Sequence, residues 1–128
     1  MSSMTDAGTA PGSDHSKIFD RITLAPAGKR LRAVFAGEVI AESEQALVLE
    51  EDGYPPRVYF PPQDLRGEHL VPTDHHSYCP WKGDAVYWTI AVGEQSLDNG
   101  AWAYPDPPED MTAIANYVSF YDGVAIKG

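Results

Sequence analysis

The stretch Ala85-Val86-Tyr87-Trp88-Thr89-Ile90-Ala91-Val92 decides the fold class of this 128-residue chain. Side chains alternate between the two faces of a strand, and in this stretch both faces are largely apolar. One face carries Val86, Trp88 and Ile90, and the other carries Ala85, Tyr87 and Ala91. A strand of this kind is covered on both sides. We therefore expect residues 85–92 to lie at the centre of a sheet.

Shorter segments elsewhere in the chain have the composition of strands. They are residues 22–24, 31–41 with a bulge or turn at Gly37, 46–50, 57–60, 101–104 and 124–126, the last as an edge strand. Glu51-Asp52-Gly53 is typical of a hairpin turn, and the proline pairs at 55–56 and 61–62 restrict 57–60 to a short strand. The pattern predicts a mainly β protein.

One helix is expected, at about residues 107–120. Asp106 is a suitable cap, Pro107 suits a first turn, and Glu109 completes a capping box. Apolar residues then recur at helical spacing, at Met111, Ile114, Tyr117 and Val118. We expect this helix to lay one face on the sheet.

Loops and turns are expected in three further places. Residues 63–76 have the composition of a loop with one helical turn, and Pro72-Thr73-Asp74 within them resembles a turn. Gly93-Glu94 predicts a turn, and Asp98-Asn99-Gly100 predicts a second turn or a bulge.

Composition limits the classes of partner and compartment. Nineteen acidic and nine basic residues give a net charge of −10, so nucleic acid is not expected as a partner. The single cysteine rules out an intrachain disulfide and favours a reducing compartment. No stretch approaches the ~20 apolar residues of a membrane span, and the N-terminus lacks the features of a signal peptide. We expect a disordered tail at 1–17, a single domain at 18–128, and a cytoplasmic protein without membrane contact.

Four ordered motifs carry a family resemblance. They are Tyr59-Phe60-Pro61, Cys79-Pro80-Trp81-Lys82-Gly83-Asp84-Ala85 with Tyr87-Trp88, Ala101-Trp102-Ala103-Tyr104-Pro105-Asp106-Pro107, and Phe120-Tyr121. From about residue 21 to 126 the chain resembles the bacterial family called domain of unknown function 427 (DUF427). The resemblance implies a small antiparallel β-domain similar to the β-tent of methionine sulfoxide reductase B and the Mss4-type zinc proteins.

The resemblance implies no particular activity. The family also carries a nucleotidyltransferase-type label, but nucleotidyl transfer needs a phosphate-binding loop and metal-binding carboxylates. Neither a P-loop nor a Gly-x-Gly-x-x-Gly motif occurs in the chain. Asp98, Asp106 and Asp110 are better explained as turn and cap residues.

The run His75-His76-Ser77-Tyr78-Cys79-Pro80-Trp81-Lys82-Gly83-Asp84 contains the candidate catalytic residues Cys79, Lys82 and Asp84. Lys82 would favour the thiolate of Cys79, Asp84 would anchor Lys82 or orient a histidine, and His75 or His76 would act as general base. The alternative is a tight structural corner, with Pro80 for rigidity, Gly83 for its backbone freedom and Cys79 as a packed side chain.

A metal site is not expected. His69, His75, His76 and Cys79 lie within eleven residues of one another. However, adjacent histidines point different ways in most backbones, and a structural zinc site needs four ligands. We therefore predict neither a metal nor another cofactor.

Aromatic side chains beside one cation suggest a ligand pocket. The candidate lining residues are Tyr59, Trp81, Lys82, Trp88, Trp102 and Tyr104. Such side chains combine apolar area with one polar group, and Lys82 or Arg57 would pair with a small anionic or planar ligand. The leading hypothesis is a small-molecule or protein binding module. The alternatives are a small enzyme that uses Cys79, a structural protein whose edge strands form a homodimer, and an ordinary arrangement in which these aromatics only pack the core.

Overall fold

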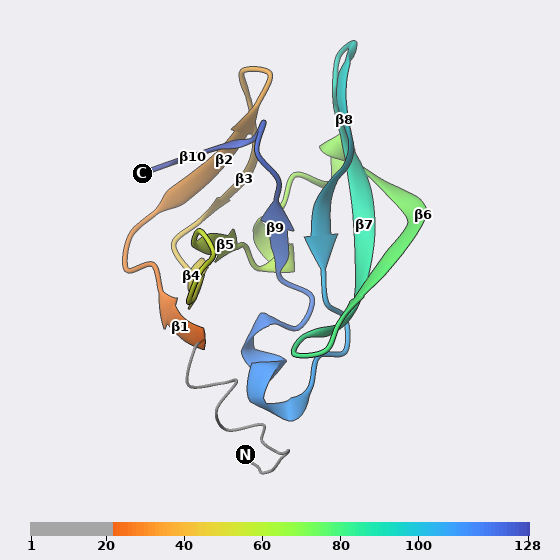
Figure 1. The fold of residues 1–128 in the computed structure, drawn as a ribbon. Coiled ribbons are helices and arrows are strands. Elements are labelled where there is room, and N and C mark those ends of the chain that lie inside the picture. The colour runs from red at the N-terminus through yellow and green to blue at the C-terminus, as the bar shows by residue number, and fades with distance from the viewer. Residues whose placement is uncertain (1–21) are drawn as a thin grey trace. The chain divides into compact units, whose positions relative to one another are not determined.

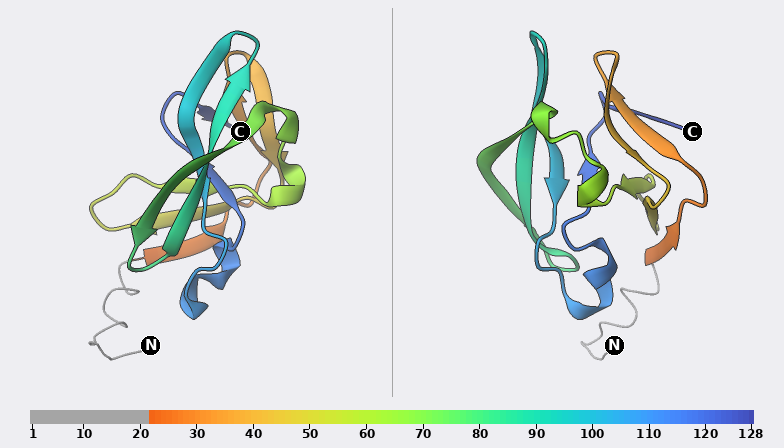
Figure 2. Two further views of the ribbon diagram at one scale, coloured as in Figure 1. Left: turned by 90° about the vertical axis from the view of Figure 1, so that its right-hand side faces the viewer. Right: turned by 180° about the vertical axis from the view of Figure 1, so that it is seen from behind.

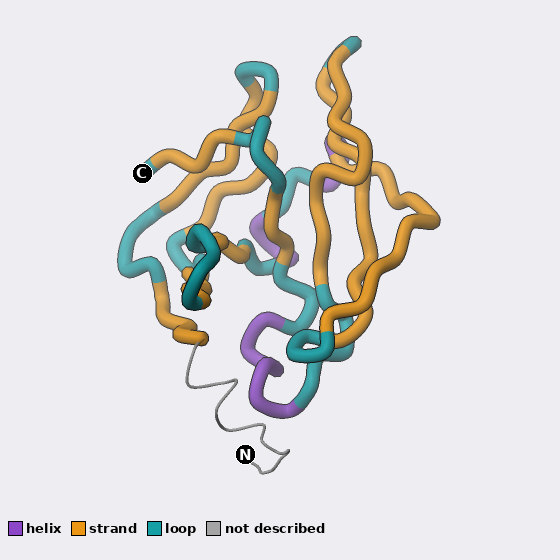
Figure 3. Tube along the Cα trace, viewed as in Figure 1, coloured by secondary structure: helices purple, strands orange, loops and turns teal. Residues whose placement is uncertain are grey.

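The computed structural model describes residues 22–128, and these residues form strands and short 3-10 helices but no α-helix (Figure 3). The strands are β1 (Ile22–Pro26), β2 (Leu31–Phe35), β3 (Glu38–Ser43), β4 (Leu47–Glu51), β5 (Arg57–Tyr59), β6 (Leu70–Cys79), β7 (Gly83–Val92), β8 (Gln95–Ala103), β9 (Val118–Phe120) and β10 (Ala125–Lys127). The 3-10 helices are η1 (Pro62–Asp64), η2 (Gly67–His69) and η3 (Glu109–Ile114). The prediction of a mainly β, antiparallel protein is confirmed.

The described residues form two compact units. The first comprises residues 22–25 and 48–57 and holds most of a three-stranded sheet with the order β1-β4-β5. The second comprises residues 26–47 and 58–128 and holds a three-stranded sheet, β10-β2-β3, and a four-stranded sheet, β6-β7-β8-β9. The predicted tail at 1–17 lies outside the described residues, and the single domain at 18–128 stays a prediction.

Strand β7 lies inside the four-stranded sheet, between β6 and β8, as its two apolar faces predicted (Figure 1). Its register with β8 places Val86 opposite Ala103, Tyr87 opposite Trp102, and Trp88 opposite Ala101. Figure 2 shows the same sheet from two further sides. The expected bulge near residues 98–100 occurs as a register shift in this pair, with Asn99 at a φ of 51°.

The hydrophobic core of the second unit lies on one face of this sheet. Its residues come from both sheets of the unit and from the segment at Phe60: Leu31, Ala33, Ile40, Ala41, Ala46, Phe60, Ile90, Ala101, Ala103, Val118, Phe120 and Val124. The rings of Phe60 and Phe120 pack with their centroids 5.8 Å apart. Val86, Trp88 and Leu97 are partly buried against this cluster. We call the side of the four-stranded sheet that faces this cluster the core face.

The predicted helix at 107–120 is wrong. The segment forms the six-residue 3-10 helix η3 and then strand β9, which pairs with β8. Met111 and Ile114 are both buried, because residues three apart lie above one another in a 3-10 helix. Asn116 then takes a φ of 66°, a left-handed conformation that interrupts a helix. Pro108, not Asp106, is the cap residue, and no side chain caps it.

The loop expected at 63–76 is partly confirmed. Two 3-10 turns, η1 and η2, precede Leu70, but residues 70–76 belong to strand β6, so the turn predicted at Pro72-Thr73-Asp74 is wrong. Pro72 is tolerated in β6 because this strand lies at the edge of its sheet and its register with β7 shifts between Pro72 and His76.

A tight turn at residues 79–83 joins β6 to β7. The backbone N–H of Lys82 donates to the Cys79 carbonyl at 3.1 Å, and Gly83 has a φ of 92°. A Cβ on Gly83 would lie 3.2 Å from the Asp106 carbonyl oxygen. The turn therefore needs glycine both for its backbone conformation and for its closeness to the chain that follows β8.

Substitution at Gly83 tests this close approach. Gly37 is the matched control, because its φ is 81° and a Cβ there meets nothing within 4 Å. Gly37→Ala should cost about 1–2 kcal/mol from backbone strain alone. We expect Gly83→Ala to cost a further ~1 kcal/mol or more, because the neighbouring backbone must move. Urea unfolding measures both, and equal losses would show that residues 106–108 do not approach Gly83.

Candidate functional site

The face of the four-stranded sheet opposite the core face carries a row of polar and aromatic side chains. Tyr87 on β7 is paired with Trp102 on β8, and Trp102 is paired with Ser119 on β9. Directly opposed residues of antiparallel strands share a face, and so do residues two apart, which adds Tyr104. All four side chains are buried. We call this surface the aromatic face and define it by Tyr87, Trp102, Tyr104 and Ser119.

Tyr59 reaches the same side from the end of β5. Its neighbour Phe60 is bridged to Val118 and belongs to the hydrophobic core. Because successive residues of an extended segment point to opposite sides, Tyr59 points away from the core, as Ser119 does beside Val118. Tyr59 is fully buried and is one of the groups that influence the ionisation of Tyr104.

Lys82 is placed at this face by the turn between β6 and β7. Its Nζ lies 5.8 Å from the centre of the Tyr104 ring. A cation within about 6 Å of an aromatic ring is attracted by the ring's electron-rich face. The turn thus sets a positive charge beside buried aromatic side chains.

The Tyr104 phenol is held in its neutral form. Burial raises the pKa of Tyr104 well above its ordinary range, and the neighbouring groups Tyr59, Cys79, Tyr87 and Tyr121 raise it further. A neutral phenol keeps its O–H as a hydrogen-bond donor. Tyr104 therefore keeps its O–H above the pH at which an ordinary tyrosine ionises.

One of the aromatic residues predicted for a pocket lies elsewhere, and another lies beside the aromatic face in the turn that carries Lys82. Trp88 is on the core face, where it packs against the hydrophobic cluster. Trp81 is half-buried within the turn between β6 and β7. The structure therefore brings Tyr59, Lys82, Trp102 and Tyr104 to one side of the sheet, but not Trp88.

The residues predicted for thiol chemistry are also divided. Cys79, half-buried, ends β6 opposite Gly83 and contributes to the raised pKa of Tyr104. Asp84 pairs with Tyr78, which precedes Cys79, so Asp84 and Cys79 point to opposite faces. Asp84 is also exposed, unlike Lys82.

Neither candidate base lies next to Cys79 along β6. The ring of His75 meets Tyr87 edge-on at 4.5 Å between centroids, and its four-residue separation from Cys79 corresponds to ~13 Å of extended strand. His76 alternates with Ser77 and so points to the other face. Among residues 22–128, no group of three or more His, Cys, Asp or Glu side chains is arranged to hold a metal ion.

Sequence reasoning missed several polar groups at the aromatic face. Ser77 Oγ and the Tyr87 hydroxyl form a 2.7 Å hydrogen bond, and the Thr73 hydroxyl donates to Asn99 Oδ1 at 2.7 Å. Alternation along residues 76–79 puts Ser77 and Cys79 on one face, but only the register of β6 with β7 brings Ser77 beside Tyr87. Ser119 was missed because residues 118–120 were assigned to a helix.

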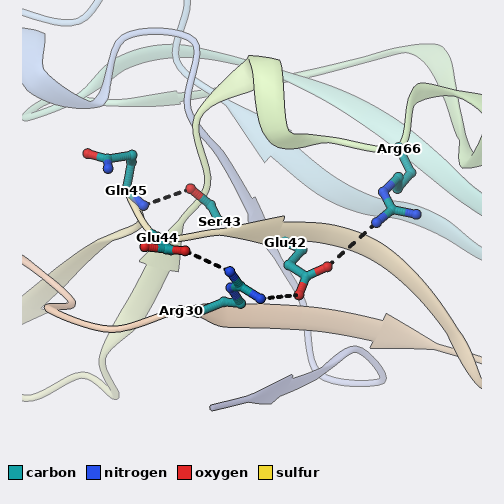
Figure 4. Close-up of polar contacts among 6 residues, drawn as sticks. All are labelled: Arg30, Glu42, Ser43, Glu44, Gln45 and Arg66. Atoms are coloured by element: carbon teal, nitrogen blue, oxygen red, sulfur yellow. Dashed lines mark hydrogen bonds and ion pairs between the residues drawn. The ribbon is translucent and has the colours of Figure 1, made fainter.

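A hollow lies at the end of β3 and is lined by none of the residues of the aromatic face. It has a volume of about 430 Å³ and is lined by Arg30, Glu42, Ser43, Glu44, Gln45 and Asp64. Arg30 contacts Glu44 at 2.7 Å and Glu42 at 3.8 Å, and Arg66 contacts Glu42 at 3.6 Å (Figure 4). The hydrogen bond to Glu44 raises the pKa of the Arg30 guanidinium. These ion pairs are largely exposed, so we treat the hollow as a solvated surface feature.

The described residues form a small antiparallel β protein in which buried tyrosine and tryptophan side chains lie near Lys82. The chain belongs to the family described as Domain of unknown function (DUF427), whose model matches residues 23–127. This match confirms the resemblance that the four motifs indicated. Comparison with curated proteins finds no match. None of the helices in the described part of the chain is long and apolar enough to cross a membrane.

The burial of Tyr104 predicts a pH-dependent stability. An unfolded chain ionises this phenol at about pH 10, whereas the folded protein keeps it protonated to higher pH. Above pH 10 the folded state therefore binds more protons than the unfolded state, so the free energy of unfolding must fall as the pH rises.

Urea unfolding between pH 8 and pH 11.5 measures this fall, and Tyr104→Phe should make it shallower. The free energies of unfolding of the two proteins are compared at pH 8 first. At this pH the phenol is not ionised, so the difference reports only the loss of the hydroxyl. If the free energy of unfolding falls equally with pH in the wild type and in Tyr104→Phe, then Tyr104 is not the group responsible.

Proposed function

We propose that this protein is a binding module for a small, planar, anionic molecule that contacts the aromatic face. The observation that carries the proposal is the position of Lys82, whose ammonium lies beside the ring of the buried Tyr104. Trp102, whose ring packs against Tyr121 at 4.4 Å between centroids, would supply apolar area to the body of the ligand, and the fully buried Tyr59 would support the site from within. Trp81, half-buried in the adjacent turn, would lie at the edge of the site.

The chemistry of these groups favours an anion with an aromatic body. A lysine supplies charge to an anionic group, and indole and phenol rings supply broad contact area with one polar group each. Because Tyr104 stays protonated, its hydroxyl adds no negative charge that would repel an anion. The net charge of −10 repels anions at long range, so the attraction would have to come from the short-range contact with Lys82.

An enzyme that uses Cys79 has less support from the geometry. The predicted mechanism uses His75 or His76 as general base for the thiol, and both residues lie away from Cys79. Asp84, the third member of the predicted catalytic set, points to the opposite face of the sheet. Ligand binding at the aromatic face requires neither a base beside Cys79 nor Asp84 on the same face as Cys79.

Titration with benzoate, a planar aromatic carboxylate, tests the proposal. Backbone and indole N–H signals in a two-dimensional NMR spectrum report binding, and we expect the Trp102 signals to move. Lys82→Gln should weaken binding by roughly 10- to 100-fold, since hydrogen bonds to charged groups are worth about 1.5–3 kcal/mol.

Lys127→Gln is the control, because Lys127 is exposed on β10 in the other sheet of the same unit and the substitution removes the same charge. It should leave the benzoate affinity unchanged. The proposal fails if millimolar benzoate moves no signal at the aromatic face, or if both variants weaken binding equally.

A further inference from the structure

Ser119 carries a buried hydroxyl that the rest of the described chain does not satisfy. The residue is 1% exposed, and its Oγ has no hydrogen-bond partner among residues 22–128. Ser43 offers a direct comparison within the same unit. It is 4% exposed, and its Oγ accepts a hydrogen bond from the Gln45 backbone N–H at 2.8 Å.

An unpaired buried hydroxyl lowers stability, because it loses its hydrogen bonds to water and gains none in return. Alanine at this position would avoid that loss and would still fit a buried strand. A buried hydroxyl without a partner in the chain is paired with a water molecule or with a ligand atom.

The register of β9 places this hydroxyl on the aromatic face. Val118 and Phe120 belong to the hydrophobic core, so Ser119 between them points the other way. It lies directly opposite Trp102 and diagonally from Tyr104, a backbone separation of about 7–8 Å in an antiparallel pair. Lys82 Nζ lies 5.8 Å from the centre of the Tyr104 ring.

We propose that Ser119 determines the specificity of the aromatic face by pairing with a second polar group of the ligand. The inference rests on the proposed function and narrows its ligand class. The ligand is a planar acid whose anionic group lies at Lys82 and whose hydroxyl or carbonyl group, across an aromatic ring, lies at Ser119. Trp102, which is opposite Ser119 and whose ring also packs against Tyr121 at 4.4 Å between centroids, would contact the aromatic ring of the ligand.

Paired titrations with benzoate and 4-hydroxybenzoate test this inference, since the two acids differ by one hydroxyl. The wild type should bind 4-hydroxybenzoate roughly 3- to 10-fold more tightly, the range for one neutral hydrogen bond. Ser119→Ala should bring this ratio close to one with little change for benzoate. Lys82→Gln should weaken both acids by a similar factor and leave the ratio unchanged.

The outcomes separate the two proposals. If both acids bind through Lys82 but the ratio is the same in the wild type and Ser119→Ala, the role of Ser119 is wrong and the proposed function stands. If neither acid binds, the proposed function fails, and the inference fails with it.

A measurement without any ligand gives an independent test. In urea unfolding, Ser119→Ala should be as stable as the wild type or more stable, because it removes an unpaired hydroxyl. Ser43→Ala should raise the unfolding equilibrium constant about 2- to 10-fold, because it removes a hydrogen bond. An equal rise for Ser119→Ala would mean that its hydroxyl is already paired, which would overturn the inference.

Discussion

Strand β7 has hydrogen-bonded neighbours on both sides and buried side chains on both faces, and this double coverage organises the second unit. Ile90 is fully buried within the hydrophobic core, and Tyr87 is buried on the aromatic face. A shift of register by one residue would exchange the two faces along the strand. The hydrophobic core requires apolar side chains on the face of β7 that it covers, so it fixes the register of this strand. The same register determines which side chains lie on the aromatic face.

A turn and a loop of the backbone hold the aromatic face in place. The turn at 79–83 sets Lys82 beside Tyr104. The chain that leaves β8 passes Gly83 and returns through η3 to Tyr104, where the Asn116 N–H donates to the Tyr104 carbonyl at 3.1 Å and Ala115 forms a bridge. The loop begins at Tyr104, and residues 115 and 116 at its other end hold the Tyr104 backbone in place. The side chains proposed to bind a ligand depend on backbone geometry at their edges.

Much of the fold could be predicted from local patterns. The central position of β7, the short strand between two proline pairs, the turn at Gly37 and the last edge strand follow from alternation and from proline and glycine chemistry. The segment 107–120 could not be predicted, because Met111 and Ile114 satisfy a 3-10 turn as well as an α-helix. Only the tertiary pairing of β9 with β8 decides between the two.

The candidate site could be predicted only in part, for the same reason. Lys82, Trp102 and Tyr104 were identified by residue type, but the face on which each residue lies depends on register. Alternation alone separates Trp88 from Tyr87, but only the register shows that Trp102 and Ser119 share the face of Tyr87. Homodimer formation through edge strands stays a prediction, and Pro72 with the register shift in β6 is of the kind that discourages edge pairing.

The central claim is that the core fixes a register in which Tyr87, Trp102 and Ser119 form one row across β7, β8 and β9. Backbone nuclear Overhauser effects between paired strands measure this register directly. The account predicts cross-strand contacts that join Tyr87 to Trp102 and Trp102 to Ser119. Contacts shifted by one residue, which would turn Trp102 toward the hydrophobic core, would contradict it.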